Sequence, residues 1–201
     1  MSSPLTFFAS ARAVLVGCAW VLLVGAGSAA LLRYQRAPGE SGVATETWPE
    51  ESSLARPSGR PTLLVFGHPR CPCTGATLGE LEALLRVAGT NAAVTIVFSK
   101  PASAQAGWDD TGLARRALTI PGVTVADDID GIEAQRFGAK TSGFTLLYSA
   151  DGKLLFRGGI TDGRGHSGDN IGRAAVTALL RGNRAETTRT QVFGCPLFAT
   201  S

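Results

Sequence analysis

The stretch that most constrains the fold is Gly67-His68-Pro69-Arg70-Cys71-Pro72-Cys73-Thr74, in which two cysteines flank a proline. It follows strand-forming residues 62–66 and precedes apolar residues spaced as in a helix, up to about residue 88. The N–H groups of a first helical turn favour a thiolate over a thiol, and we expect positive charge on Arg70 and His68 to act in the same direction. The pattern predicts a nucleophile or a metal ligand here, rather than two inert buried cysteines.

Further strand-forming and helix-forming segments follow this corner. Residues 92–98 predict a second strand, parallel to the first because a helix connects them. A short helix is expected near 111–118, a short strand at 123–125, a helix at 131–137, a hairpin formed by 144–148 and 153–157, and a last helix that is capped by Asp169 or Ser167 and ends near Leu180. The carboxylates Asp127, Asp128, Asp130 and Glu133 are interpreted as helix caps rather than as a cation site.

A strand, a cysteine pair with proline and then a helix resemble the opening of the thioredoxin fold, where the usual motif is Cys-x-x-Cys. The motif His-Pro-Arg-Cys-Pro-Cys-Thr also resembles that of the bacterial thioredoxin-like proteins called RedB, over about residues 61–196. The order of elements is similar to the TlpA-type and peroxiredoxin branches. The resemblance implies an α/β thioredoxin-like fold, with a central mixed sheet flanked by helices, preceded by one transmembrane helix.

Two alignments with the family motif remain open. Counted from the preceding strand, Cys71 takes the place of the family's nucleophile and Thr74 that of its resolving cysteine. Counted from the proline, Arg70 and Cys73 take those two places. The family also carries a cis-proline before its third core strand, where this sequence has Gly143 or Phe144. That departure counts against standard dithiol–disulfide catalysis.

Residues 13–32 form an uncharged apolar run of the length that a helix needs to cross a bilayer. Arg12 precedes it, and Arg33 and Arg36 follow it, so the flanking charges orient it weakly. The small residues 27–30 also fit a cleaved signal peptide, but the length of the run favours an uncleaved anchor. We expect a single-pass protein of the bacterial inner membrane, with its body facing the periplasm or exterior.

The expected division of the chain follows from these segments. Residues 1–12 form an amino-terminal flank, 13–32 the transmembrane anchor, 33–60 a flexible linker rich in Pro, Gly, Ser and Glu, 61–186 the thioredoxin-like domain, and 187–201 a carboxyl-terminal tail. The net charge of +3 is spread over the chain without a basic block, which argues against nucleic acid as a partner.

Two distant features could join the cysteine pair. The glycine-rich segment 158–170 follows the fourth strand and holds Arg164 and His166, so either side chain could stabilise a thiolate or supply a ligand. The apolar tail holds Cys195, which could fold back as a resolving thiol or could be incidental. Cys18 lies within the apolar run and has no evident chemistry.

Three functions remain open. The first is a membrane-anchored thiol–disulfide oxidoreductase that acts on protein thiols or disulfides without a cofactor, with Cys71, Cys73 and Cys195 as catalytic candidates. The second is a copper chaperone with Cys71, Cys73 and His166 as ligands, a set that resembles the copper chaperones of oxidase assembly. The third is a binding module without turnover. A Cys71–Cys73 disulfide would close a small strained ring, and we expect such a couple to be comparatively oxidising.

Overall fold

The structure is a computed structural model that describes residues 4–89 and 91–198, and it separates into two compact units, 1–36 and 37–201. Helix α1 (Pro4–Arg36) belongs to the first unit. Its segment Ala11–Arg36 is long and apolar enough to cross a membrane, a criterion that a signal sequence near an amino terminus also meets. The predicted apolar helix is therefore present, and it extends beyond residues 13–32 at both ends.

The second unit contains one five-stranded sheet with the order β3-β2-β1-β4-β5. Its strands are β1 (Thr62–Gly67), β2 (Ala93–Lys100), β3 (Val123–Ile129), β4 (Phe144–Tyr148) and β5 (Leu154–Gly158). Strands β1, β2 and β3 are parallel, while β4 and β5 are antiparallel to their neighbours. The strand β1 is buried along its whole length, as its uninterrupted apolar sequence predicts for a central strand. The expected thioredoxin-like α/β fold is confirmed, including the hairpin.

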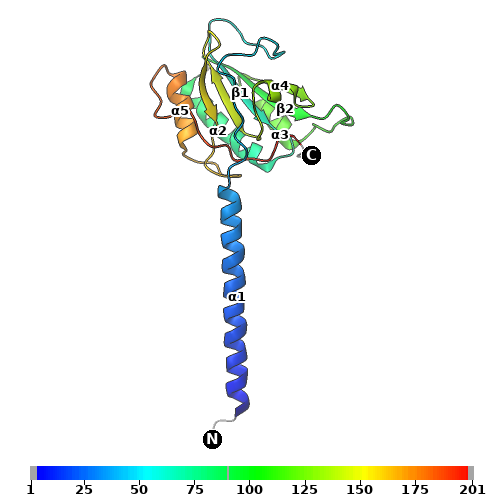
Figure 1. Cartoon of the computed structure of the whole chain (residues 1–201), viewed down its shortest axis with the longest axis vertical. Coiled ribbons are helices and arrows are strands. Elements are labelled where there is room, and N and C mark those ends of the chain that lie inside the picture. Colours follow the sequence, from blue (N-terminus) through cyan, green and yellow to red (C-terminus); the bar gives the residue numbers. More distant parts are fainter. Residues whose placement is uncertain (1–3, 90, 199–201) are drawn as a thin grey trace. The chain divides into compact units, whose positions relative to one another are not determined.

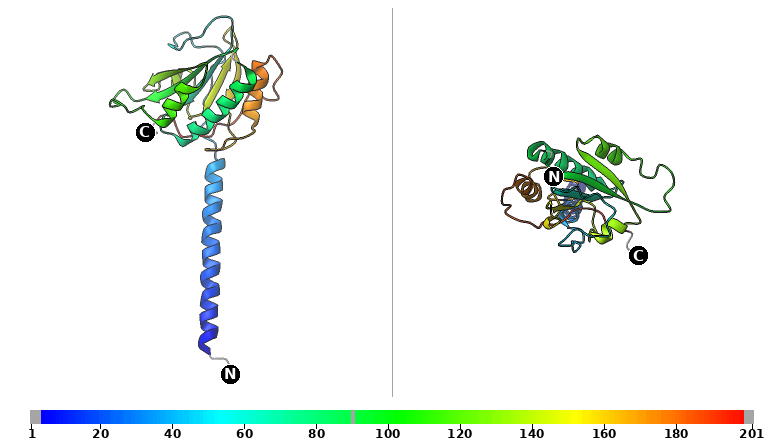
Figure 2. Two further views of the ribbon diagram at one scale, coloured as in Figure 1. Left: turned by 180° about the vertical axis from the view of Figure 1, so that it is seen from behind. Right: turned by 90° about the horizontal axis from the view of Figure 1, so that it is seen from above.

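Helices α2 (Pro72–Ala88), α3 (Gly112–Thr119) and α5 (Ile171–Leu180) cover one face of the sheet (Figures 1 and 2). The short helix α4 (Ile132–Arg136) lies on the other face, together with part of the carboxyl-terminal tail. Alternate residues of each strand point to opposite faces, so Leu63 and Val65 enter the first core while Leu64 and Phe66 enter the second. The two cores fix the sheet, and with it the corner at which β1 meets α2.

Residues 37–60 of the predicted flexible linker, 33–60, instead pack on the second core. Ala44 is buried there, and the Trp48 ring lies 4.9 Å from the ring of Phe137 and 5.4 Å from that of Tyr148. The backbone N–H of Trp48 also donates to the carbonyl of Gly152 at 2.9 Å. The polar composition of the segment misled the prediction, because a few apolar side chains and backbone hydrogen bonds suffice to hold it against a preformed surface.

Two capping predictions have different outcomes. Asp128 accepts hydrogen bonds from the N–H groups of Glu133 and Ala134 at 2.8 and 2.9 Å, so a carboxylate caps α4 as expected. The cap of α5 is Asn170, which accepts from the N–H of Arg173 at 2.7 Å, and not Asp169 or Ser167. The strand β3 is longer than predicted and includes Asp127 and Asp128.

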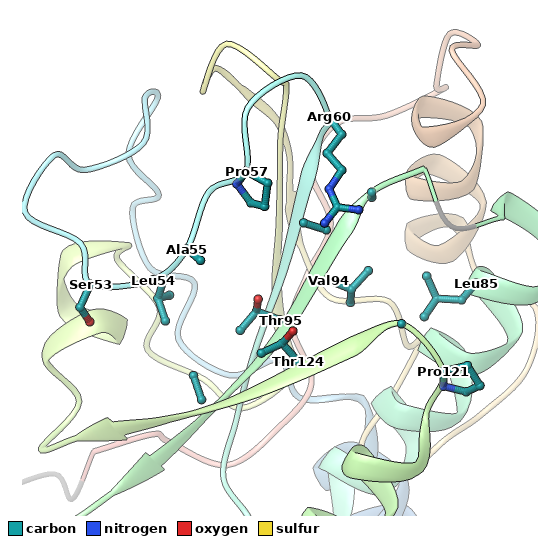
Figure 3. A pocket seen from close by; sticks show the side chains of 14 residues that line it. Ser53, Leu54, Ala55, Pro57, Arg60, Leu85, Val94, Thr95, Pro121 and Thr124 are labelled. Atoms are coloured by element: carbon teal, nitrogen blue, oxygen red, sulfur yellow. The ribbon is translucent and has the colours of Figure 1, made fainter.

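The domain contains a cavity of about 370 Å³ (Figure 3). It is bounded by the segment 53–60, by the first residues of β2 and by β3, and the Arg60 side chain extends toward the strands beside it. Because Cys71 follows the carboxyl end of β1, the cavity and the cysteines are at opposite ends of the parallel strands. The cavity is therefore separate from the candidate site described next.

Candidate thiol site

Cys71 occupies the N-cap position of α2, at the end of the turn that leaves β1. Its N–H donates to the carbonyl of His68 at 3.0 Å, and its own carbonyl accepts from the N–H of Thr74 at 3.0 Å. Pro72 follows as the first residue of the helix, where its missing N–H leaves no helical hydrogen bond unmade. Helix α2 thus begins at Pro72, and Cys71 is the cysteine at its start.

The loop before β4 holds this corner in place. Ser142 Oγ accepts from the N–H of His68 at 3.1 Å and lies 2.9 Å from Thr74 Oγ1. The N–H of Gly143 donates to the carbonyl of Phe66 at 2.7 Å. Gly143 has φ of +94°, a conformation that glycine adopts without strain. The sequence places Gly143 or Phe144 where the family has its cis-proline. It does not indicate the role of Ser142, because the partners of Ser142 lie far away in the sequence.

The carboxyl-terminal tail crosses the body from the α5 side toward α4 (Figure 1, red) and passes over Cys71. It first runs beside β5, where the N–H of Arg157 donates to the carbonyl of Thr188 at 3.0 Å. It then pairs with residues 140–142 through an antiparallel bridge between Thr141 and Pro196. The tail therefore folds back and brings Cys195 next to Cys71.

The sulfur atoms of Cys71 and Cys195 lie 3.0 Å apart, and both are free thiols. Cys71 is only 2% exposed. Burial raises the pKa of Cys71, but hydrogen bonds to its sulfur outweigh that effect and lower the pKa. The donors are the S–H of Cys195 and the backbone N–H groups of Cys195, Cys73 and Thr74. Cys71 is therefore the thiol of the site that ionises first.

The other two thiols of the site shift in the opposite direction. Burial comes first, and then the hydrogen bond that the Cys195 S–H donates to a Cys71 thiolate and the negative charge of that thiolate; together they raise the pKa of Cys195 to about 12. Burial and the Cys71 charge also raise the pKa of Cys73, although the N–H of Gly165 and the Arg164 charge oppose this. A nucleophile with a lowered pKa beside thiols with raised pKa values is the order that an attacking and a resolving thiol need.

The two charged residues next to the motif do not act as predicted. Arg70 binds Trp108: its Nη2 donates to the Trp108 carbonyl at 2.9 Å, and its guanidinium lies over the Trp108 ring at 4.9 Å. Burial and the nearby Arg70 charge lower the pKa of His68, which favours its neutral form. The lowered pKa of Cys71 instead comes from the hydrogen bonds described above. The guanidinium charge of Arg164 acts on Cys73 and Cys195.

Arg164 connects the glycine-rich segment to the tail. Its Nη1 donates to the carbonyl of Gly194, and its Nε donates to the carbonyl of Ala37 at 3.2 Å. The same segment is held to α2 by Glu80, which is 3% exposed and accepts from the N–H of Gly168 at 2.7 Å and from Arg173 Nη1 at 2.7 Å. The sequence predicted that the segment could join the cysteine pair, but it did not indicate the role of Glu80.

The copper set is not assembled. In the described ranges, 4–89 and 91–198, no group of three or more His, Cys, Asp or Glu residues is placed to hold a metal ion. His166 is exposed, and its N–H donates to the carbonyl of Gly163 at 3.3 Å. Cys71, Cys73 and His166 therefore do not form the three-ligand site that a copper chaperone of this kind requires.

No protein-family model matches the sequence, and no curated protein matches it. Among solved structures, a hypothetical protein from Sinorhizobium meliloti 1021 is similar at 22% identity, with 82% of this chain and 96% of that chain covered and a TM-score of 0.58. An uncharacterized conserved protein from Geobacillus kaustophilus is similar at 17% identity, with 82% and 93% covered and a TM-score of 0.59. A secreted disulfide oxidoreductase of Mycobacterium tuberculosis is similar at 18% identity, with 62% and 83% covered and a TM-score of 0.44.

These similarities concern the fold. The strand order, the cysteine at the start of α2 and the helices on both faces make the second unit a thioredoxin-like domain. Three separate parts of the chain form its site. The β1–α2 corner and the tail supply the thiols, and the segment 158–170 contacts them.

Proposed function

We propose that this chain is a membrane-anchored thiol–disulfide oxidoreductase in which Cys71 is the nucleophile and Cys195 is the resolving thiol. The observation that carries the proposal is the 3.0 Å separation of their sulfur atoms. A disulfide needs a sulfur–sulfur distance of about 2.05 Å, so a shift of roughly 1 Å closes the bond. Cys71 and Cys73 would have to close the strained ring across Pro72 instead.

The reaction with a protein disulfide has two steps. The Cys71 thiolate attacks one sulfur of the substrate disulfide, forms a mixed disulfide and releases the other sulfur, which takes up a proton. Cys195 then loses its proton and attacks the Cys71 sulfur, which releases the second substrate thiol and leaves a Cys71–Cys195 disulfide. Two electrons pass from the protein to the substrate. The same steps in reverse oxidise a substrate dithiol.

The electrostatics of the site order these steps. Before reaction, the Cys71 thiolate keeps Cys195 protonated, because two adjacent negative charges are unfavourable. Formation of the mixed disulfide removes the charge on Cys71, so the pKa of Cys195 falls at the moment when its thiolate is needed. The nearby Arg164 charge then favours the Cys195 thiolate.

Disulfide mapping in the full chain, purified in detergent with Cys18→Ala, tests the assignment. The reduced protein is mixed with glutathione disulfide, quenched with acid and digested for mass spectrometry. We expect a Cys71–Cys195 disulfide, an accumulated Cys71 mixed disulfide in Cys195→Ser, and unimpaired closure in Cys73→Ser. A Cys71–Cys73 disulfide that forms equally fast in Cys195→Ser would overturn the role of Cys195.

We also propose that the body faces an oxidising compartment outside the cytoplasm. Two observations support this placement. The apolar segment Ala11–Arg36 could anchor the chain in a membrane, and disulfides persist in oxidising compartments outside the cytoplasm. Protease treatment of intact spheroplasts tests this placement: the body should be degraded from outside, and complete protection would contradict it.

A further inference from the structure

We propose that residues Gly194 to Phe198, here called the tail gate, cover Cys71 at rest and must move aside before a disulfide substrate can reach its sulfur. The closed gate also supplies two of the hydrogen-bond donors that stabilise the Cys71 thiolate. This inference rests on the proposed function, and it adds a conformational step to it.

The gate occupies the space that a substrate sulfur needs. Thiol–disulfide exchange requires an attacking thiolate to approach a disulfide sulfur directly, in line with the bond that breaks. Cys71 is 2% exposed, and the sulfur of Cys195 lies 3.0 Å from its own. A protein disulfide cannot make that approach while Cys195 stays where it is.

The other walls around Cys71 belong to the framework of the domain. His68, Thr74 and Ser142 are bound to one another, and the loop before β4 is bound to β1 through Gly143 and Phe66. These residues connect two central strands and the start of α2. Their displacement would disrupt the sheet. The tail, in contrast, is not a strand of the sheet and can move without breaking it.

The tail divides into a fixed part and the gate. Val192 is 1% exposed in the second core, and its carbonyl accepts from the N–H of Gly39 at 2.8 Å. Beyond Phe193, two hydrogen bonds between backbone groups hold the chain to residues 140–142: the N–H of Ser142 to the Cys195 carbonyl, 2.8 Å, and the N–H of Leu197 to the Lys140 carbonyl, 2.9 Å. One further hydrogen bond, from Arg164 Nη1 to the Gly194 carbonyl, holds the first residue of the gate. A short segment with so few attachments is the kind of unit that opens locally.

Two apolar side chains keep the gate closed. Leu197 is 6% exposed and packs in the second core. The ring of Phe198 lies against Gly131, where a β-carbon would lie 1.9 Å from the ring. Truncation of either side chain weakens the closed state without altering a group that bonds to the sulfur of Cys71.

Opening has two effects on Cys71 that can be measured separately. It exposes the sulfur, so the alkylation rate of the thiolate rises. It also withdraws the S–H and N–H of Cys195 from the Cys71 sulfur, so the thiolate becomes less stable and the midpoint of the pH profile rises. Among the described residues, His68 and Arg70 of the turn and Cys73 of α2 are the titratable or charged neighbours of Cys71 along the chain, and Arg164 of the segment 158–170 acts on Cys73 and Cys195. Gate variants leave all four in place.

The experiment compares pH profiles of Cys71 alkylation by iodoacetamide in the reduced full chain with Cys18→Ala, read by peptide mass spectrometry. We expect Leu197→Ala and Phe198→Ala to raise the plateau rate by about 10- to 100-fold and to raise the midpoint pH. A chain that ends at Phe193 gives the fully open reference, with the highest plateau and midpoint. Leu154→Ala, which truncates a partly buried leucine of the same core outside the gate, is the matched control and should leave both values unchanged.

Equal plateaus in the parent, Leu197→Ala and the chain that ends at Phe193 would overturn the gate, even where the Cys71–Cys195 disulfide still forms. A rise in Leu154→Ala as large as that in Leu197→Ala would also overturn it, because general loosening would then explain the effect. If the plateaus differ as expected while the disulfide maps to Cys73, the gate stands and the resolving role of Cys195 fails.

Discussion

The α-carbon of Gly194 lies so close to the carbonyl oxygen of Ser142 that a β-carbon on Gly194 would be 1.9 Å from that oxygen. Cys195 therefore reaches Cys71 only because the residue before it has no side chain. The contact joins the tail to the loop before β4, and it sets how near the two sulfur atoms come.

Gly194→Ala should push the tail away from Ser142 and slow the closure of the Cys71–Cys195 disulfide at least tenfold, because geometry within about 1 Å governs such a step. Stopped-flow reaction of the reduced chain with glutathione disulfide measures closure. Gly112→Ala is the matched control, since a β-carbon at Gly112 meets nothing within 4 Å. Equal closure rates in both variants would contradict the role of this contact.

Cys195→Ala should raise the pKa of Cys71, because it removes the S–H donor that helps to lower that pKa. The alkylation midpoint of Cys71 should move to higher pH, and Cys73→Ala, which keeps its backbone N–H, should move it less. The sign for stability follows from the lowered pKa. The contribution of the Cys71 thiolate to the free energy of unfolding is complete above the unfolded-state pKa of about 8.5. It is lost as the pH falls through the pKa of Cys71 in the folded state.

Glu80→Gln should lower the free energy of unfolding by about 1–3 kcal/mol, because it removes the charge that Arg173 and the N–H of Gly168 bind in a buried position. Urea unfolding measures the change. Glu82→Gln is the matched control: its ion pair with Arg116 is more exposed, so its loss should cost less than about 1 kcal/mol. A larger loss in Glu82→Gln than in Glu80→Gln would contradict this assignment.

Trp48→Ala tests whether the segment 37–60 belongs to the folded body. The ring packs edge-on against Phe137 and Tyr148. We therefore expect the free energy of unfolding, measured in urea, to fall by about 1–3 kcal/mol, and the segment to be proteolysed faster. Val43, which is 81% exposed, offers the control: Val43→Ala should change stability by less than about 0.5 kcal/mol. A flexible tether would show no difference between the two variants.

The sequence by itself determined the elements whose signals are local. The apolar run 62–66 predicted a buried strand, because a central parallel strand is covered on both faces. The strand-forming segments 144–148 and 153–157 predicted the hairpin, and the uncharged run 13–32 predicted the apolar helix. Cys71 beside Pro72 predicted a thiol at a helix start, and the N–H groups of that turn do bond to its sulfur. In each case the residues that carry the signal are those that form the structure.

Only the tertiary structure decided which thiol faces Cys71. Cys195 is 124 residues away, and it is brought there by the pairing of the tail with residues 140–142 and by the absence of a side chain on Gly194. The same holds for Ser142, for Glu80 and for the packed segment 37–60. Such contacts depend on surfaces that exist only after the sheet and helices have assembled, so no periodicity or spacing along the chain records them.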